Sequence, residues 1–457
     1  MSTRSGSLTR AIAIDALTHV LTRNIHSDVA LEKLFASHPN LRSLDKAFIY
    51  EMVFGSLRWL AKMDWIMSHM LDRSFSSLDP RVANALRIGT YQIYYMDRVP
   101  ERAAVSETVE AIKQVGVPNA ASLVNAILRR VAKKSEYFPK PDKVTQAVEY
   151  YSMHHSFPQW MVERWYKQLT LERFEYLLAN NNRIPKNSLR QITRNELPNS
   201  EKDLATYLLK TQSIESSWRP LPGTLRIETL PKFNECEAFN KGCYIVQDEA
   251  AQLATCLVQP SPTDQCLDAC AAPGGKSIYL WDSGLEAQNL TVCDFAQKRL
   301  KILRENFTRV GLEGAQILHG DAVEQCIGKK FNKILLDAPC SAMGVIRRHP
   351  EIKWLRTLSD IQNCAMEQAR LLDGLAKNVT VGGELIYIVC SFEIEETTQQ
   401  ISQFLEKHPE FEKINPSDRI HDFYKKYVTR ENELLIYSGN PDDLDGFFGV
   451  VLKKNNE

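Results

Sequence analysis

Cysteine is missing from the first 235 of the 457 residues, although the whole chain contains ten. No two of the ten have the C-x-x-C spacing that is typical of zinc sites and thiol–disulfide motifs. We therefore expect no metal site. A reducing compartment would also keep the thiols from forming a disulfide framework. Most of them are expected to be small packing groups, and one or two to take part in chemistry.

Long apolar runs are also missing, since none approaches the ~20 residues of a membrane-spanning helix. The first ten residues are polar and lack the apolar stretch of a secretory signal. Internal repeats and low-complexity segments are not evident. We expect a cytoplasmic protein without membrane contact, and the length indicates two to four domains.

Net charge is zero, because 56 Lys and Arg balance 56 Asp and Glu. Neutrality argues against coating nucleic acid by bulk charge, and the ordinary composition excludes a wholly disordered chain, a collagen and a small disulfide scaffold. The charge is nevertheless divided along the chain: the net charge is +6 over residues 1–140, +1 over 141–240 and −7 over 241–457. This asymmetry predicts different tasks for the two ends.

Residues 1–140 are expected to form an all-α domain, because four segments have apolar residues at helical spacing. Thr9–Leu21 is the first, Asp79 and Pro80 begin the second as N-cap and N1, a third follows Pro100, and Asn119 caps the fourth. The fourth helix ends in basic residues: Arg129, Arg130, Lys133 and Lys134. They form either a solvated basic helix end or a patch that contacts phosphates.

The middle of the chain, 141–240, is expected to be a linker followed by a small α/β region. Ser135–Lys143 contains two prolines and is the predicted linker. A helical stretch over Trp160–Leu178 is followed by strand-like runs at Leu189–Thr193 and Thr224–Glu228.

Residues 241–457 alternate between strand and helix patterns. The expected strands are Gln265–Asp268, Leu290–Asp294, Gln316–His319, Lys333–Asp337 and Glu384–Cys390. The expected helices are Lys276–Trp281, Gln297–Val310, Leu358–Asn378 and Glu393–Lys407. This order predicts a mostly parallel, Rossmann-like α/β sheet covered on both faces. Ligands of such sheets bind beyond the carboxyl ends of the strands.

A glycine pair follows the first of these strands, within the segment Cys270, Ala271, Ala272, Pro273, Gly274, Gly275 and Lys276. Glycines between a strand and a helix let backbone approach a ligand and expose helix N–H groups. Asp294 and Asp321 follow the next two strands, where a carboxylate can accept hydrogen bonds from a ribose diol. These features together predict an adenosine-bearing cofactor, with a purely structural turn as the alternative.

Two cysteine–serine pairs follow the fourth and fifth strands, at Cys340 and Cys390, and Asp337 ends the fourth strand. If these strands are neighbours, both thiols face one pocket; otherwise they are inert buried thiols. A thiolate that adds to carbon 6 of cytosine makes carbon 5 nucleophilic toward an activated methyl group. An acid near ring nitrogen 3, here Asp337, would assist the addition if it is partly desolvated.

With these motifs in view, residues 242–451 resemble the Fmu/Sun family of RNA (cytosine-5)-methyltransferases. The matching strings are VQDEA from Val246, the Asp268–Lys276 segment, DAPC from Asp337, VCS from Val389 and DGFF from Asp445. The first 130 residues resemble the NusB-type RNA-binding helical domain through LRIGTYQ from Leu86 and VNAILR from Val124.

The resemblance implies S-adenosylmethionine as the donor and a cytidine of 16S ribosomal RNA as the target, before the small subunit is fully assembled, by an enzyme acting as a monomer. It also implies that Cys390 is the nucleophile and that Cys340 assists product release. The donor would be contacted by Cys270–Lys276, Asp294, Asp321 and Asp337. Val389 stands where the family often has threonine, which removes a hydroxyl beside the nucleophile but leaves the thiol.

The loop after Cys340 contains Arg347 and Arg348, which we expect either to contact RNA phosphates or to lie in a solvated basic loop. Trp354 beyond them stacks on a base or packs in a core. Two other classes of protein stay open: a non-catalytic RNA-binding assembly factor, and a dinucleotide-dependent oxidoreductase. The retained cysteines argue against the first, and the missing G-x-G-x-x-G against the second.

Overall fold

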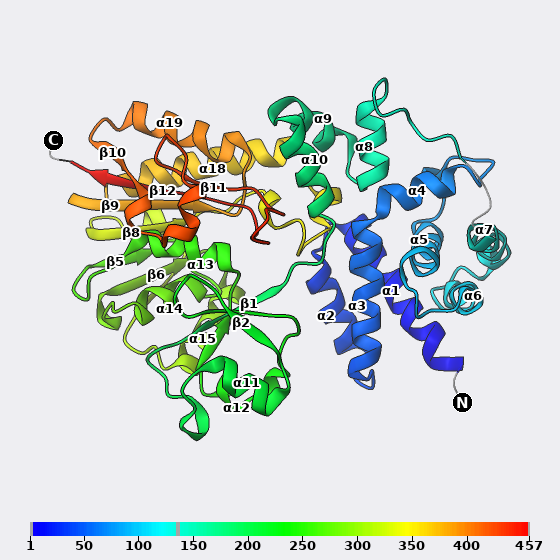
Figure 1. Ribbon diagram of the computed structural model, residues 1–457, viewed down its shortest axis with the longest axis horizontal. Helices are drawn as coiled ribbons and strands as arrows, with labels where there is room; N and C mark the ends of the chain where they lie inside the picture. The colour runs from blue at the N-terminus through cyan, green and yellow to red at the C-terminus, as the bar shows by residue number, and fades with distance from the viewer. Residues whose placement is uncertain (1–2, 134–137, 456–457) are drawn as a thin grey trace. The chain divides into compact units, whose positions relative to one another are not determined.

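The computed structural model describes residues 3–133 and 138–455 and divides into two compact units (Figure 1). The helical unit comprises the described residues up to Arg183 together with Ile346–Arg356. The sheet unit comprises Ile184–Val345 and the chain from Thr357 onward. Within the described part of the chain, no helix is both long and apolar enough to cross a membrane. The predicted domain boundaries, after residues 140 and 240, stay a prediction.

The helical unit contains only helices and turns among its described residues. Its α-helices are α1 (Thr3–Arg23), α2 (Ser27–Ala36), α3 (Ser43–Arg58), α4 (Leu60–Ser68), α5 (Pro80–Tyr95), α6 (Glu101–Gln114), α7 (Ala121–Lys133), α8 (Ala147–His155), α9 (Gln159–Gln168), α10 (Leu171–Asn180) and α17 (Ile352–Leu355). The buried side of α1 packs against α3, α5 and α6. Trp354 and Leu355 of α17 pack against the same core.

Helix ends in this unit test the capping predictions. Asp79 is the N-cap of α5, with Pro80 at N1, as predicted, and its carboxylate accepts from the backbone N–H of Arg81 at 2.8 Å. The predicted cap at Asn119 is wrong, because Pro118–Ala120 forms a 3-10 turn and α7 begins at Ala121. Lys134 and the first residues of the predicted linker lie outside the described residues.

The predicted single helix over residues 160–178 is two helices, α9 and α10. The break comes at Thr170, whose hydroxyl accepts from the backbone N–H of Arg173 and caps α10. The helical periodicity continues across the break, and for this reason the sequence pattern does not show it.

The sheet unit begins with a small antiparallel sheet of strand order β2-β3-β1-β4. Its elements are β1 (Asn187–Gln191), α11 (Leu204–Gln212), β2 (Ser216–Trp218), β3 (Thr224–Ile227), α12 (Glu237–Asn240) and β4 (Tyr244–Val246). The two predicted strand runs are β1 and β3, paired directly with each other.

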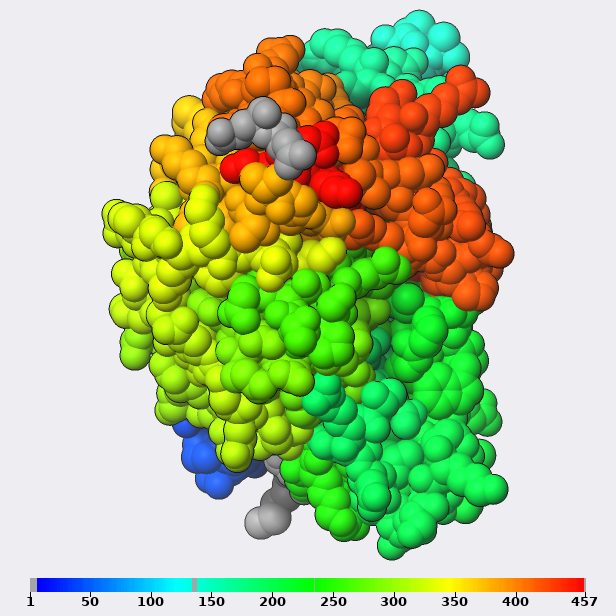
Figure 2. All heavy atoms as spheres, turned by 90° about the vertical axis from the view of Figure 1, so that its left-hand side faces the viewer, coloured from blue at the N-terminus to red at the C-terminus, as the bar shows by residue number. Residues whose placement is uncertain are grey.

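The large sheet has the order β10-β12-β9-β8-β5-β6-β7, and β11 pairs with β12. Its strands are β5 (Cys266–Asp268), β6 (Leu290–Asp294), β7 (Gln316–His319), β8 (Phe331–Asp337), β9 (Val379–Val389), β10 (Phe411–Ile414), β11 (Leu434–Ile436) and β12 (Phe447–Lys454). The run β9-β8-β5-β6-β7 is parallel. The three other strands, absent from the sequence prediction, add antiparallel pairs. In Figure 2 the red end of β12 lies among orange residues of neighbouring segments.

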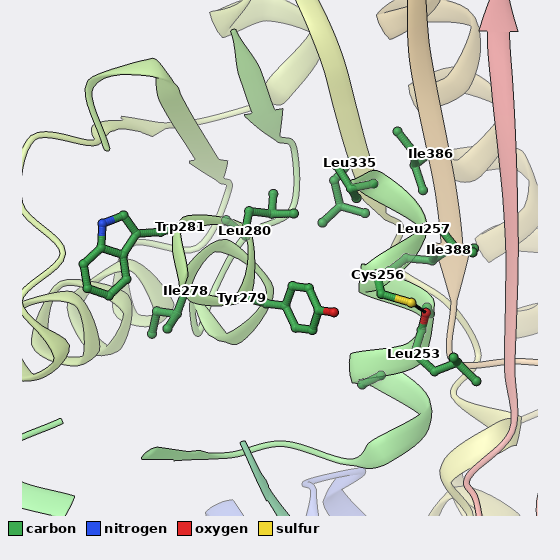
Figure 3. Close-up of a cluster of buried hydrophobic side chains, with 14 of the residues drawn as sticks. Leu253, Cys256, Leu257, Ile278, Tyr279, Leu280, Trp281, Leu335, Ile386 and Ile388 are labelled. Carbon is green, nitrogen blue, oxygen red and sulfur yellow. Dashed lines mark hydrogen bonds between the residues drawn. The ribbon is translucent and has the colours of Figure 1, made fainter. Parts of the chain in front are cut away.

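Helices cover both faces of this sheet, as the pattern predicts. They are α13 (Glu249–Thr255), α14 (Gly275–Asp282), α15 (Gln297–Val310), α16 (Ala322–Gln325), α18 (Leu358–Ala376) and α19 (Thr398–Lys407). Leu335 and Ile386 face the first three of these, and the alternate residues Leu336 and Tyr387 face a second cluster on the other side. Figure 3 shows the first cluster, with Leu257 directed at the strands.

The strand order places the site. From β5 the chain moves outward to β6 and β7, and then returns to the other side of β5 as β8. The topological switch point therefore lies between the carboxyl ends of β5 and β8, where open α/β sheets bind ligands. The glycine turn follows β5, and the Cys340 loop follows β8.

Candidate active site

The glycine turn after β5 has a conformation that requires glycine. Gly274 has φ +102°, and a Cβ atom there would lie 2.9 Å from Phe307 Cε1. Helix α14 begins at the next residue and leaves its first N–H groups at the turn. Asp268, at the end of β5, accepts from Ser277 Oγ at 2.6 Å, and its other carboxyl oxygen is buried without a partner. Burial raises the pKa of Asp268 to about 7.

Asp294 ends β6 and is oriented by the backbone. Its carboxylate accepts from the N–H of Ala272 at 3.1 Å and from the N–H of Ala296 at 2.9 Å. These bonds tie the end of β6 to the glycine turn. Phe295 follows immediately and is 78% exposed, which is unusual for a large apolar side chain. Phe295 was not among the predicted site residues, although it follows the acidic residue directly in the sequence.

Asp321 and Cys270 are less directly suited to binding a cofactor than predicted. Asp321 is the N-cap of α16 and forms an ion pair with Arg370. Burial alone would raise the pKa of Asp321, but the bonds from Arg370 and from backbone N–H groups keep it below its ordinary value. Burial raises the pKa of Cys270, so its thiol stays neutral.

The structure brings the two predicted thiols together. β8 and β9 are parallel neighbours, with Asp337 opposite Ile388. Cys340 Sγ and Cys390 Sγ lie 3.0 Å apart. Gly344 fixes the backbone of this pair, because its N–H donates to the Cys390 carbonyl at 3.0 Å.

Lys276, the last residue of the predicted glycine segment, extends toward Asp337 and interacts with Cys390. Its Nζ donates to Asp337 Oδ2 at 2.6 Å. Burial would lower the pKa of Lys276, but Asp337, Asp268 and Cys390 together raise it, so the ammonium stays charged next to Cys390. For Cys340 the hydrogen bond with Cys390, burial and the nearby Glu396 carboxylate all raise the pKa, so it keeps its proton.

Glu396 is a site residue that sequence reasoning missed. The predicted helix from Glu393 begins only at Thr398, and Ile394–Glu396 forms a 3-10 turn that directs Glu396 inward. The carboxylate is wholly buried and accepts from both Ser341 and Ser391. The signal that could have found it is a glutamate six residues after Cys390, but local spacing does not show that both serines reach it.

Comparisons with known proteins identify the family. A model described as 16S rRNA methyltransferase RsmB/F matches residues 255–453, and a NusB family model matches residues 7–133. Ribosomal RNA small subunit methyltransferase B of Proteus mirabilis is 32% identical over 448 residues, covering 97% of this chain and 98% of its own. The protein of the same name from Klebsiella pneumoniae is 32% identical over 407 residues, covering 88% of this chain and 90% of its own. The chain belongs to the ribosomal RNA small subunit methyltransferase B family.

Solved structures agree with this membership in fold. The crystal structure of PH0851 has a TM-score of 0.82 and 25% identity, covering 99% of this chain and all of that one. NSun6 from Pyrococcus horikoshii, at 19% identity and a TM-score of 0.57, covers 66% of this chain and shares the fold. The resemblance and the predicted fold class are thereby confirmed. As a member of the ribosomal RNA small subunit methyltransferase B family, the protein is an rRNA methyltransferase that depends on S-adenosylmethionine.

The residues at the switch point fit that donor. The Gly274–Gly275 turn presents helix N–H groups, and Asp294 presents a carboxylate beside it. Gln247, whose side-chain nitrogen is the nearest neighbour of a Cβ built on Gly275, has a buried oxygen without a partner. Phe295 offers an exposed apolar ring for an adenine. A polar atom left unpaired in a buried position favours a ligand that can hydrogen-bond to it.

The residues predicted to contact RNA differ in their exposure to solvent. Arg129 is exposed on α7, whereas Arg130 donates to the Met70 carbonyl at 2.8 Å. Arg347 is only 1% exposed, so the predicted phosphate contact is corrected: a buried guanidinium does not reach RNA, and the neighbouring Arg348 is half-exposed. Trp354 donates to the Leu57 carbonyl at 2.7 Å and packs on the helical core, which decides for the packing interpretation.

Proposed function

We propose that the protein transfers a methyl group from S-adenosylmethionine to carbon 5 of a cytidine in 16S ribosomal RNA, in the cytoplasm. The observation that carries this proposal is the 3.0 Å separation of the Cys340 and Cys390 thiols, at adjacent strand ends and next to the Lys276–Asp337 pair. Two thiols held together at a donor site match a reaction that needs one thiol to add to the base and a second to assist release.

The chemistry follows from the residues at this pair. The Cys390 thiolate forms a bond to carbon 6 of cytosine, and the displaced electron pair makes carbon 5 nucleophilic. S-adenosylmethionine, when bound, supplies the activated methyl group that carbon 5 takes. A solvent water then takes the proton from carbon 5. The electron pair of the broken carbon–hydrogen bond re-forms the carbon 5–carbon 6 double bond, the sulfur–carbon bond breaks, and Cys390 leaves as a thiolate.

The surroundings of the thiols assign their roles. The charged Lys276 ammonium lies close enough to Cys390 for the two groups to interact electrostatically, and a cation stabilises a thiolate that forms beside it. Cys340 keeps its proton and can share it with the Cys390 sulfur. In the Lys276–Asp337 pair Asp337 is the acceptor, so the Lys276 ammonium is the group that donates a hydrogen bond at ring nitrogen 3, where negative charge develops during the addition. These features support Cys390 as the nucleophile and Cys340 as the residue that assists release.

RNA recognition is assigned to the predicted domains. We propose that residues 1–140, with net charge +6, bind RNA, and that 241–457 form the catalytic domain, with 141–240 between them. The substrate is 16S ribosomal RNA before full assembly of the small subunit, bound by a monomer. The target cytosine has to be unstacked to reach a thiol at a strand end, which favours a loop or single strand.

The decisive experiment compares cysteine variants in one assay. Cys390→Ala is expected to lose both methyl transfer and any covalent RNA complex, because no thiolate adds to carbon 6. Cys340→Ala is expected to accumulate the complex as an RNA-linked band on a denaturing gel. Cys364→Ala, which removes a thiol from outside the pair, should behave as wild type. Accumulation in Cys390→Ala instead of Cys340→Ala would reverse the assignment, and tritium transfer without any complex would refute covalent catalysis.

A further inference from the structure

One buried carboxylate, that of Glu396, binds the serine after each of the two cysteines. We infer that Glu396 is a positioning residue that holds the Cys340 and Cys390 loops at their working separation, by binding the serine that follows each cysteine. This inference rests on the proposed function, because the separation matters only if both thiols act on one substrate.

The hydrogen bonds of Glu396 show how one side chain serves both loops. Its Oε1 accepts from the backbone N–H of Ser341 at 2.7 Å, and its Oε2 accepts from the Ser341 hydroxyl. The same Oε2 accepts from the Ser391 hydroxyl at 2.5 Å. The two hydroxyls lie 3.3 Å apart. The serines thus form a pair that parallels the thiol pair, one residue further along each loop.

Further hydrogen bonds hold the Glu396 side chain and its turn in place. Gln368 of α18 donates to Glu396 Oε1 at 3.1 Å and to the Pro339 carbonyl at 2.9 Å, so it holds the Cys340 loop from its other side. The Tyr387 hydroxyl donates to the Glu396 backbone carbonyl at 2.7 Å and ties the turn to β9. Glu396, Ser341, Ser391 and Gln368 are all 0% exposed. Buried networks of this kind fix one geometry because a broken bond leaves an unsatisfied polar group.

A carboxylate is required for this arrangement. Both serine hydroxyls and the Ser341 N–H are donors, and Gln368 adds a fourth donor from its amide. A carboxylate accepts all four on two oxygens, whereas the amide of a glutamine offers one accepting oxygen and an NH₂ group that is itself a donor. Glu396→Gln therefore changes the network without removing volume.

The expected consequence is a defect in chemistry and not in binding. The donor residues and the RNA surface are not part of the network, whereas the distance between Cys340 and Cys390 is set by it. A displacement of about 1 Å between reacting groups lowers a rate by up to about 100-fold. Because Cys340 stands in the loop that Glu396 and Gln368 hold, release of the product is the step that should slow most.

The experiment uses the full chain with Glu396→Gln, Glu396→Asp and a matched control, Glu406→Gln, whose carboxylate is exposed on α19. We expect Glu396→Gln to lower kcat about tenfold or more with unchanged KM for RNA and unchanged donor affinity, and to accumulate the covalent RNA complex seen with Cys340→Ala. Glu396→Asp should restore part of kcat, because the acceptor oxygens return on a shorter stem. Glu406→Gln should match wild type.

A measurement without RNA separates the inference from the proposed function. Dibromobimane, which bridges two neighbouring thiols, should link Cys340 to Cys390 in the wild type and less in Glu396→Gln, as read by peptide mass spectrometry. Unchanged bridging, or loss of activity through a raised KM alone, overturns the inference while Cys340→Ala still accumulates the complex and upholds the proposed function. If bridging falls in Glu396→Gln and no variant forms a complex, the positioning role stands and the covalent mechanism fails.

Discussion

Asp268 is a buried residue with a consequence for the pH dependence of stability. It lies under the glycine turn, bonded only to Ser277 in the described structure, and its charged form lacks solvation. A pKa of about 7 means that the folded protein holds this proton between about pH 4 and 7, where the unfolded chain releases it. The contribution of Asp268 to the free energy of unfolding is therefore fully present below about pH 4 and is lost as the pH rises toward about 7.

Asp268→Asn tests this linkage. The loss of unfolding free energy from Asp268 over the window is up to about 4 kcal/mol, because each pKa unit corresponds to about 1.36 kcal/mol. Urea unfolding at a series of pH values should show a steeper decline between about pH 4 and 7 in wild type than in Asp268→Asn. Parallel curves for the two proteins would show that Asp268 titrates normally.

Asp294 is the second residue with a separable role. If its carboxylate binds the donor ribose, Asp294→Ala should weaken donor binding by about 1–3 kcal/mol, because a buried hydrogen bond to a charged acceptor is lost. Calorimetry with S-adenosylhomocysteine measures this directly. Asp418→Ala, which removes an exposed carboxylate in the same unit, is the control. Equal affinity in the Asp294 variant would remove this residue from the donor site.

At the scale of elements, the loop that contains Gly344 crosses the loop that contains Gly446, and this crossing supports the backbone of Cys390. A Cβ atom on Gly344 would lie 2.0 Å from the Gly446 carbonyl oxygen and 2.9 Å from that of Cys390. Gly446 in turn donates to the Gly344 carbonyl at 2.8 Å. The DGFF string, which leads into β12, therefore acts as a backbone support for the thiol site.

Gly344→Ala should destabilise the protein by about 1–3 kcal/mol, because overpacking displaces backbone. It should also reduce methyl transfer more than it reduces stability, since the Cys390 carbonyl moves with it. Gly328→Ala is the comparison: it has φ +76° but nothing within 4 Å of the added carbon, so it brings backbone strain without a clash. Thermal unfolding and initial rates of both variants check this, and equal effects of the two would argue against the crossing.

At the scale of the whole molecule, the two compact units are not continuous segments of the chain. The chain leaves the sheet unit after Val345, contributes Ile346–Arg356 to the helical unit, and returns at Thr357. Lys353 in this segment is wholly buried and donates to the carbonyls of Arg58 and Ser156 and to Asn182 Oδ1. Burial and the nearby Arg58 guanidinium both lower the pKa of Lys353. Deleting residues 1–140 would remove the carbonyl of Arg58, which Lys353 binds, and that of Leu57, which Trp354 binds.

A single exposed charge is therefore the better test of RNA binding by the helical unit. Arg129→Glu should weaken RNA binding and reduce the slope of log affinity against log salt by about 1, because one phosphate contact is lost. Lys202→Glu, exposed in the sheet unit, makes the same charge change outside the proposed surface. Filter binding over a salt series measures both. Equal losses for the two variants would indicate attraction by net charge alone.

Sequence patterns determined the parts of this protein that depend on neighbours along the chain. β6, β7 and α15 have the predicted bounds, because periodic apolar residues and strand-end turns are local. The glycine turn and the two cysteine-serine pairs were visible for the same reason. The antiparallel strands β10, β11 and β12 were not, since short edge strands have weak patterns and depend on pairing partners.

Only the tertiary structure decided which distant groups meet. The pairing of β8 with β9 brings two thiols fifty residues apart to 3.0 Å, and the turn before α19 adds Glu396 beneath them. The same folding buries Arg347, which sequence alone offered to RNA. Residue types and local spacing state what chemistry a chain can perform. Contacts between residues far apart in the sequence do not follow from local spacing. The burial of the site residues and their hydrogen-bond partners therefore became known only from the fold.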